Sequence, residues 1–313
     1  MPPLPSTPMP MPTSRPTRVV VAVSPAAAFG RHHGAGDSVC EVLEAAGHAV
    51  VPVVEQNFEL LRREVERELE NAAESGALVV VGGDGMVSLG VNAVAQTGIP
   101  LGVVPIGTGN DTARNIGMPI GEPAAAGRLI AAALERPPHA VDAALVTHGV
   151  HSTWVVGVVS AGFDAAVNER ANVMTWPKSQ RRYTIAVVSE LFTFRAPRYR
   201  LTVDGESREF DAMLVAVANH SSIGGGMRIA PAATMDDGLL DLVVVERMSK
   251  PRFLRVFPKV FRGEHTELPE VRIERVQHVR IEADGVVAYG DGERIGPPPL
   301  ELSVVPGAVL LLH

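Results

Sequence analysis

Short apolar runs alternate with amphipathic patterns over residues 18–145. The apolar runs predict strands that are buried on both faces, at Arg18–Val23, His48–Val54, Leu78–Val81 and Pro100–Pro105. Helical spacing predicts helices at Ser38–Ala46, Gln56–Glu74, Met86–Ala95, a short stretch from Asp111, and Pro123–Leu134. Buried strands separated by helices are typical of a doubly wound parallel sheet, which binds ligands outside the carboxyl ends of its strands.

After residue 146 the pattern changes to many short apolar segments separated by turn residues. It predicts strands at Thr153–Ser160, Arg198–Val203, Glu209–Ala218, Leu239–Val245, Val271–Arg275, Val279–Ala283, Val286–Tyr289, Leu300–Val304 and Ala308–Leu312. Helical patterns occur only near Ala165–Met174, Tyr183–Phe194 and Pro251–Phe261. Many short strands favour an antiparallel β-sandwich or barrel.

We therefore expect three parts along the chain. Residues 1–17 are rich in proline and are predicted to be a disordered tail. Residues 18–145 form the α/β domain, and residues 146–313 form the β-sandwich domain, with the last residues free to return to the first domain.

Composition narrows the classes of function. The chain has 313 residues, 46% of them apolar, and a formal charge of −7, which argues against a general nucleic-acid binder. Its single cysteine, Cys40, falls in an apolar helical pattern, so no internal disulfide forms and a reducing compartment is expected. No secretory signal and no run of about 18 apolar residues is found, so we expect a cytoplasmic protein that contacts a membrane at most peripherally.

A first glycine-rich turn follows the strand that ends in Val79–Val81. It contains Gly82, Gly83, Asp84 and Gly85. Glycines let several backbone N–H groups converge on one anion. Asp84 would repel a bare phosphate, which suggests that a divalent cation lies between them, as in a nucleotide bound with magnesium. The alternative is a tight strand-to-helix turn that Asp84 caps.

A second glycine-rich turn follows the strand that ends at Pro105. Gly107, Thr108 and Gly109 turn the chain, and Asn110-Asp111 open a helix. A helix N-terminus offers free N–H groups and partial positive charge to a phosphate. Asn110 could be a plain N-cap, which would leave the glycines before it unexplained. Two such turns on adjacent strands predict a two-walled cradle for the phosphates of a nucleotide.

The two turns stand in a longer ordered set of motifs. A GGDG turn is followed by GTGND, VSAGFDAAVNERAN (159–172), VANHSSIGGGMRIAPAATMDDGLLDLVVV (217–245) and YGDGE (289–293). This order resembles the diacylglycerol kinase catalytic family and its bacterial lipid-kinase relatives, within the NAD kinase–diacylglycerol kinase superfamily. The resemblance implies an active site in the cleft between the two domains. It also implies transfer of the γ-phosphate of ATP, with Mg²⁺, to a lipid hydroxyl, most simply that of diacylglycerol.

The resemblance also implies roles for individual residues. Asp291 matches the general base, with Glu293 beside it. Asp237 matches a magnesium site that also uses the main-chain oxygens of Thr234 and Leu239, with Asp142 tied to that network. The nucleotide-binding positions are Gly82–Gly85, Gly107–Asp111 and, at the start of the first loop, Ser24. Without the family, Asp291-Gly292 and Asp237-Gly238 are better explained as hairpin turns than as functional carboxylates.

The chain departs from the family pattern at two places. Met86 stands where the family often has threonine after GGDG, so a hydroxyl is lost near the nucleotide. The first loop, Ser24–Gly30, lacks most of the family's polar side chains, which leaves its contacts to ATP open.

Two clusters of basic and aromatic residues are candidates for membrane contact. One contains Trp176, and the other runs from Lys250 to Arg262 with Phe253, Phe257 and Phe261 at spacings of four. The second cluster could instead be a helix that buries its phenylalanines against the sandwich. We expect peripheral contact with the inner face of the membrane through one cluster, no nucleic-acid partner, and a homodimer through exposed sheet edges.

Two other functions stay open at this point. An NAD kinase-like metabolite kinase would share the nucleotide turn, but it would leave GFDAAVNER and GGGM unexplained. A non-catalytic homologue that binds a nucleotide or lipid would account for Met86 and the weakened first loop.

Overall fold

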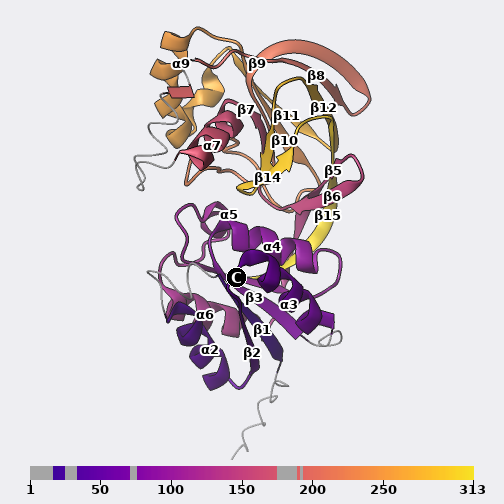
Figure 1. Cartoon of the computed structure of the whole chain (residues 1–313). Helices are drawn as coiled ribbons and strands as arrows, with labels where there is room; N and C mark the ends of the chain where they lie inside the picture. The colour runs from indigo at the N-terminus through magenta and orange to yellow at the C-terminus, as the bar shows by residue number, and fades with distance from the viewer. Residues whose placement is uncertain (1–16, 25–33, 71–75, 175–188, 191–192) are drawn as a thin grey trace, which may run out of the picture.

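The computed structural model describes residues 17–24, 34–70, 76–174, 189–190 and 193–313. Figure 1 shows two bodies, an α/β body drawn in indigo and purple and a β-rich body drawn in pink, orange and yellow. The predicted tail, except Thr17, lies outside the described residues, as do Trp176 and most of the helix predicted at Tyr183–Phe194. Among the helices of the described residues, none has the length and apolar character needed to cross a membrane.

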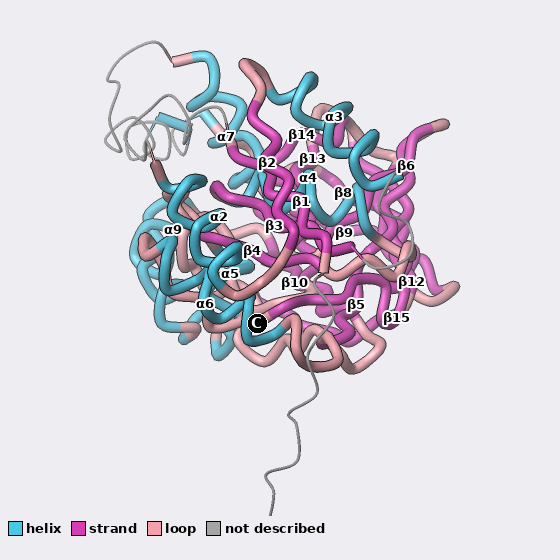
Figure 2. The backbone as a smooth tube through the Cα atoms, turned by 90° about the horizontal axis from the view of Figure 1, so that it is seen from below, coloured by secondary structure: helices cyan, strands magenta, loops and turns pink. Residues whose placement is uncertain are grey.

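The first body is a parallel sheet covered on both faces by helices. Its strands lie in the order β4 (Leu101–Pro105), β3 (Gly76–Gly82), β1 (Arg18–Val23) and β2 (Ala49–Val54). Helices α2 (Ala35–Ala45) and α6 (Pro123–Ala133) lie on one face, and α3 (Phe58–Glu70) and α4 (Asp84–Val94) lie on the other (Figures 1 and 2). The short helix α5 (Asp111–Asn115) follows β4.

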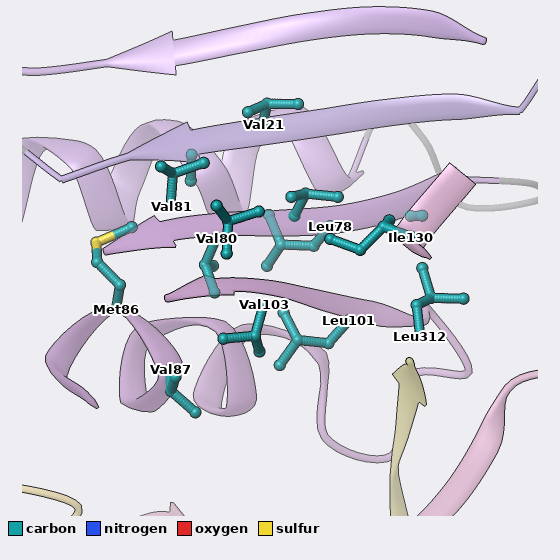
Figure 3. Packing of buried hydrophobic residues seen from close by; sticks show 14 of the residues in the cluster. Val21, Leu78, Val80, Val81, Met86, Val87, Leu101, Val103, Ile130 and Leu312 are labelled. Atoms are coloured by element: carbon teal, nitrogen blue, oxygen red, sulfur yellow. The ribbon is translucent and has the colours of Figure 1, made fainter. Parts of the chain in front are cut away.

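This body has its own apolar core, built from the strands that the sequence predicts as buried. Every residue of β3 and β4 is buried, which is why both strands are apolar throughout rather than alternating. Leu78, Val80, Leu101 and Val103, labelled in Figure 3, are buried on the face of the sheet that α4 covers, and Ile130 of α6 packs over Gly102 on the opposite face. The sheet is thereby held rigidly with its carboxyl ends facing the second body.

The second body is an antiparallel sandwich of two layers. One layer contains β5 (His139–His148), β6 (His151–Val155), β8 (Arg198–Val203), β12 (His278–Ala283) and β15 (Leu300–Leu312). The other contains β7 (Val158–Gly162), β10 (Leu240–Glu246), β11 (Val271–Val276), β13 (Ala288–Gly290) and β14 (Glu293–Gly296). The long strand β9 (Glu206–Ala218) pairs with β8 in its first half and with β7 and β10 in its second half.

Helices cover the outer face of the second layer. They are α7 (Phe163–Val173), α9 (Lys250–Val256) and the 3₁₀ segments η1 (Phe257–Arg262) and η2 (Glu264–Glu267). A second core fills the space between the two layers of the sandwich. A third core lies between the second layer and the helices that cover it. The predicted combination of a doubly wound parallel sheet with a β-sandwich is confirmed.

Strand β15 joins the two bodies. It pairs with β12 and β5 and then ends beside β4, where Leu311 and Leu312 pair in parallel with Leu101 and Gly102. The sequence pattern predicts two separate strands here, at Leu300–Val304 and Ala308–Leu312. The structure has one strand, because a bulge between Val305 and Val309 accommodates the Pro306-Gly307 turn signal that interrupts the pattern.

Other differences from the predicted elements are local. Strand β5 was not predicted, because its apolar run is interrupted by the buried carboxylate of Asp142. The single strand predicted at Thr153–Ser160 is two strands, β6 and β7, which are separated at Val156-Gly157. The helix predicted at Pro251–Phe261 changes to 3₁₀ geometry at Phe257, so Phe253, Phe257 and Phe261 do not share one α-helical stripe.

Candidate active site

The two glycine-rich turns touch each other through their backbones. A Cβ added to Gly83 would lie 3.1 Å from the Cα of Gly107, and a Cβ added to Gly107 would overlap the Cα of Gly83. Ile106 N–H also donates to the carbonyl of Gly82 at 2.9 Å, which continues the pairing of β3 with β4. The structure thus brings together the two turns that the sequence predicts as neighbours, and glycine is required at both contact points.

Asp84 holds the second turn rather than capping its own helix. Its two carboxylate oxygens accept the N–H groups of Asn110 and Asp111, each at 2.8 Å. Helix α4, which begins at Asp84, has no side-chain cap. Burial, followed by the nearby Asp111 carboxylate, raises the pKa of Asp84, and the two N–H groups oppose this rise. The predicted cap of α4 is therefore wrong, and a contact between Asp84 and a cation stays a prediction.

The second turn is closed by the side chain of Asn110. Its Oδ1 accepts the N–H of Gly107 at 3.0 Å, and its Nδ2 donates to the carbonyl of Gly107 at 2.7 Å. Asn110 itself is buried and left-handed, with φ of 55°, and it makes no capping hydrogen bond to α5. Gly107 and Thr108 stay exposed at the rim. The turn is therefore held in shape by its own hydrogen bonds.

Asp111 ties this turn to the second body. Its carboxylate accepts the N–H groups of Gly225 and Gly226, at 2.7 and 2.8 Å. One turn of α5 later, Asn115 Oδ1 accepts both the N–H and the hydroxyl of Ser221. Charge-assisted hydrogen bonds to backbone amides are among the stronger ones in proteins. The phosphate-facing turn and the GGG segment of the sandwich domain are consequently held as one unit.

Asp291 lies at the mouth of the sandwich domain, in the two-residue turn that joins β13 to β14. Both Asp291 and Gly292 have positive φ, 49° and 83°, as a tight hairpin requires. The Asp291 carboxylate accepts the N–H groups of Val156 at 2.9 Å, Gly157 at 3.3 Å and Val158 at 3.2 Å. The hairpin explanation is thus confirmed, and the role of Asp291 as general base stays a prediction. Because Asp291 accepts the N–H groups of residues 156 and 157, these residues separate β6 from β7.

The burial of the Asp291 carboxyl group changes its pKa. Burial raises the pKa of Asp291 to about 7, against the three N–H groups, which lower it. His220 lies next to it, since a Cβ on Gly157 would overlap Asp291 Oδ1 and lie 2.6 Å from His220 Nε2. Burial lowers the pKa of His220 to about 4, so the imidazole is neutral at physiological pH. A carboxylate with a pKa near neutrality can both accept and release a proton.

Glu293 reaches across from the sandwich domain to the first turn. Its Oε1 lies where a side chain on Gly85 would be, 2.8 Å from the Cβ position. The carboxylates of Asp84 and Asp291 also influence each other, since Asp84 contributes to the raised pKa of Asp291. Carboxylates of both bodies, Asp84 from the first and Asp291 and Glu293 from the second, therefore lie near the glycine turns.

Comparisons with known proteins agree with this geometry. The model of the diacylglycerol kinase catalytic domain matches residues 18–146, and the model of the YegS C-terminal NAD kinase beta sandwich-like domain matches residues 157–313. A diacylglycerol kinase of Mycobacterium tuberculosis (strain CDC 1551 / Oshkosh) is 40% identical over 245 residues, 77% of this chain and 78% of the relative. The chain belongs to the diacylglycerol kinase family.

More distant members share the same fold. A diacylglycerol kinase of Bacillus subtilis (strain 168) is 25% identical over 232 residues, which cover 73% of this chain and 74% of the relative. A crystal structure of a diacylglycerol kinase from Bacillus anthracis str. Sterne covers 96% of this chain and 98% of its own, with a TM-score of 0.70 and 22% identity. The prediction that the protein is an enzyme of the lipid kinase class is confirmed.

One departure from the family pattern, Met86, has a structural explanation. Its side chain is buried and fills the space beside Gly82, and Figure 3 shows it against the apolar core near Val81. The residue therefore serves packing and does not reach the cleft. Ser24 lies next to the same turn, its N–H donating to the carbonyl of Val81 at 3.0 Å. The rest of the first loop lies outside the described residues.

The predicted magnesium residues form a tight turn in this diacylglycerol kinase homologue. Asp237 accepts the Thr234 hydroxyl at 2.5 Å and the Leu239 N–H at 3.0 Å, and it pairs with Arg275. Asp142 is buried, and its two oxygens accept the N–H groups of Gly238 at 2.7 Å and Gly307 at 2.9 Å. Asp142 therefore holds the 235–238 loop and the bulge of β15.

The donor set around Asp237 does not by itself make a metal site. No group of three or more His, Cys, Asp or Glu side chains close enough to hold an ion is found within the described part of the chain. The positive charge next to Asp237 is already supplied by Arg275. Magnesium at Asp237 stays a prediction.

Sequence reasoning gave no separate role to three residues that build this cleft. Asn219 is buried, and its amide donates to the carbonyls of Asp142 and Val156, at 2.7 and 2.9 Å, so it connects β5 with the break between β6 and β7. His220 and Asn115 connect the same segment to α5. The available signal was a polar Asn-His pair that directly follows the apolar end of β9.

Proposed function

We propose that this protein phosphorylates diacylglycerol, using ATP and Mg²⁺, to give phosphatidic acid. The observation that carries the proposal is the placement of Asp291. Its carboxylate is held by three backbone N–H groups, has a pKa near neutrality, and lies across the cleft from two preformed glycine turns. Phosphoryl transfer depends on such positioning and charge neutralisation more than on covalent chemistry by the protein.

In this proposal the glycine turns bind the phosphates of ATP. The N–H groups of Gly82–Gly85, Thr108 and Gly109, with the hydroxyl of the exposed Thr108, supply donors at the ends of two adjacent strands, while the N–H of Gly107 closes its own turn on Asn110. Asp84, Asn110 and Asp111 keep the turns in shape through their backbone hydrogen bonds. A site that needs no reorganisation when charge develops gives the largest electrostatic benefit.

Asp291 would act on the acceptor. Its carboxylate orients the lipid hydroxyl and takes its proton as the oxygen attacks the γ-phosphorus, and the bond to the β-phosphate oxygen breaks. Mg²⁺ would arrive with ATP and neutralise phosphate charge, because this ion is usually bound by one or two carboxylates plus substrate phosphates. Glu293 at Gly85 and Asp84 are the carboxylates of the cleft that could face such an ion.

The acceptor test compares candidate lipids and NAD directly. Purified protein is incubated with radiolabelled ATP, Mg²⁺ and mixed micelles of diacylglycerol, monoacylglycerol, a sphingoid base or ceramide, and separately with NAD. We expect label in phosphatidic acid and none in NAD phosphate. Asp291→Asn should abolish transfer. Asp284→Asn is the matched control, because Asp284-Gly285 is also an Asp-Gly turn but is exposed and distant from the glycine turns.

The alternatives give different results in the same assay. A metabolite kinase would label NAD and leave every lipid unlabelled. A non-catalytic homologue would bind ATP and label nothing, so the Asp291→Asn variant would behave as the wild type does. Equal transfer by wild type and Asp291→Asn would also reject the role proposed for Asp291.

Membrane contact is proposed for the segment that contains α9 and η1. Leu254 and Phe261 are both 50% exposed, and Arg255 and Lys259 stand beside them. Phe253 is buried and packs against Phe163, so it belongs to the core as the alternative interpretation predicts. Apolar side chains flanked by basic ones favour the interface of an anionic membrane, here the inner face.

For self-association we propose a homodimer that forms through the sheet edges β2 and β14.

A further inference from the structure

A buried histidine lies beside the carboxylate of Asp291. His220 follows the end of β9 by two residues, and it is only 2% exposed. Its contact with Asp291 is recorded at Gly157, where an added Cβ would overlap Asp291 Oδ1 and lie 2.6 Å from His220 Nε2. The carboxylate oxygen and the ring nitrogen therefore border the same small space, and only glycine at position 157 leaves room for both.

The hydrogen bonds of Asp291 hold its two oxygens unequally. Oδ2 accepts the N–H groups of Val156 and Gly157, whereas Oδ1 accepts only that of Val158. Two of the three distances, 3.3 Å from Gly157 and 3.2 Å from Val158, are at the long end for an N–H donor. The three donors come from one stretch of main chain, so the carboxyl group can still turn unless a further group packs against it. Oδ1, the oxygen with one donor, is the one beside His220.

His220 is itself held by the helix that follows the second glycine turn. Its Nε2 lies 3.3 Å from the hydroxyl oxygen of Thr112, and both side chains are buried. Thr112 is the second residue of α5. The next residue after His220 is fixed to the same helix, because Ser221 N–H donates to Asn115 Oδ1 at 3.1 Å. The ring therefore stands between α5 of the first body and Asp291 of the second.

The imidazole next to Asp291 carries no charge at physiological pH. Burial lowers the pKa of His220 to about 4, although the carboxylate of Asp111 opposes this change. A neutral ring offers one donor and one acceptor nitrogen and forms no ion pair with a carboxylate. It can pack against Asp291 without competing with the acceptor hydroxyl for the Asp291 oxygens.

We propose that His220 is a positioning residue for phosphoryl transfer, whose Nε2, held by Thr112, restricts the rotation of the Asp291 carboxyl group and keeps Oδ1 aimed at the acceptor hydroxyl. The proposal rests on the proposed function, since it concerns the base of that reaction. The proton of the hydroxyl still passes to Asp291, and His220 receives none.

Two amide variants separate positioning from simple packing. In His220→Gln the side-chain amide can reach the place of Nε2, whereas the shorter amide of His220→Asn reaches only that of Nδ1. We expect kcat to fall about 10- to 100-fold in His220→Asn and to stay within about threefold of the wild type in His220→Gln. The KM for ATP should stay within about twofold in both variants, because the glycine turns are untouched.

The expected difference between the two amides is what carries the test. Equal losses of kcat in both variants would show a packing role and would overturn the proposal. A raised KM for ATP with an unchanged kcat would overturn it as well, because His220 would then serve the nucleotide. His278→Asn is the matched control, since His278 is a partly exposed histidine of β12 in the other layer, and its kcat should equal that of the wild type.

Thr112→Val tests the other end of the contact and does not change His220. The substitution removes the hydroxyl and keeps the shape of the side chain, so kcat should fall about three- to tenfold, as expected for the loss of one hydrogen bond. Thr202→Val is its control, because the Thr202 hydroxyl pairs with Ser207 on the exposed side of β8. An unchanged kcat in Thr112→Val would mean that the hydroxyl does not hold the ring, and would overturn the proposal.

Carbon-13 NMR observes the carboxyl group without turnover. The protein is labelled at the aspartate carboxyl carbons, and the Asp291 signal is assigned by its loss in Asp291→Asn. We expect this signal to move in His220→Asn and to return close to the wild-type position in His220→Gln. Coinciding signals in the wild type and both variants would overturn the proposal.

The two proposals can fail separately. If the wild type phosphorylates diacylglycerol and His220→Asn keeps the kcat and the Asp291 signal of the wild type, the positioning role is wrong and the proposed function stands. If no lipid is phosphorylated but the Asp291 signal moves as expected, His220 positions the carboxyl group and the proposed function is wrong.

Discussion

The contact between the two glycine turns makes Gly107→Ala a sharp test of the nucleotide site. The added Cβ would overlap the Cα of Gly83 and lie 3.0 Å from both Gly83 N and Asn110 Oδ1. The neighbours are backbone or a side chain that closes the turn, so they cannot rotate away. Non-bonded carbon atoms need about 3.5–4.0 Å, so the turns must separate by about 1 Å. Gly107 does not have a positive φ, and the alanine is therefore strained by contact alone.

A displacement of this size should damage catalysis more than folding. A misplacement of about 1 Å can cost about 100-fold in rate, and overpacking costs about 1–3 kcal/mol in the free energy of unfolding. We expect kcat/KM for ATP to fall by about 100-fold in a variant that is still folded. Circular dichroism and urea unfolding measure the fold, and a fluorescent ATP analogue measures affinity directly.

Gly127→Ala is the matched control for this experiment. Gly127 lies inside α6, and its added Cβ would meet Val42 Cγ1 at 3.4 Å, an ordinary van der Waals distance. Alanine is the better helix former by about 0.5–1 kcal/mol, so this variant should be as stable as the wild type or more so, with unchanged ATP affinity. If Gly107→Ala bound ATP as the wild type does, the two turns would not form one phosphate site.

Four further predictions follow from the same geometry. Because the pKa of Asp291 is raised to about 7 and the base must be ionised, kcat/KM for the lipid should fall about tenfold from its plateau by pH 6, and a flat profile down to pH 5 would contradict this. Asp111→Ala removes the carboxylate that accepts the N–H groups of Gly225 and Gly226, so the free energy of unfolding in urea should fall by about 3 kcal/mol. A fall of less than about 0.5 kcal/mol would mean that these hydrogen bonds do not stabilise the fold. If Mg²⁺ binds at Asp237, it should raise the melting temperature of the wild type more than that of Asp237→Asn, and equal shifts would remove the site. Phe261→Ser should weaken binding to anionic vesicles without changing ATP affinity, and a vesicle affinity equal to that of the wild type would exclude this segment from the interface.

Local patterns were sufficient for most of the architecture. Strands β3 and β4 are buried on both faces, so their apolar runs could be recognised without knowledge of their neighbours. The glycine turns could be recognised because they directly follow these apolar runs. Strand β5 was missed because Asp142 interrupts its apolar run, and that carboxylate is acceptable in the core only because the distant Gly238 and Gly307 supply its hydrogen bonds.

The amino-acid sequence by itself determined the fold class and the position of both glycine turns, because these depend on spacing and on the conformational range of glycine. The roles predicted for Asp291, Glu293, Asp237 and Asp142 came instead from the resemblance of the ordered motifs to the family. Only the tertiary structure decided what the carboxylates do. Asp84 serves the second turn, Asp111 serves the sandwich domain, and Asp291 is aimed by the amides of residues 156–158. A carboxylate takes its role from the donors that surround it, and here those donors lie 26 to 135 residues away along the chain.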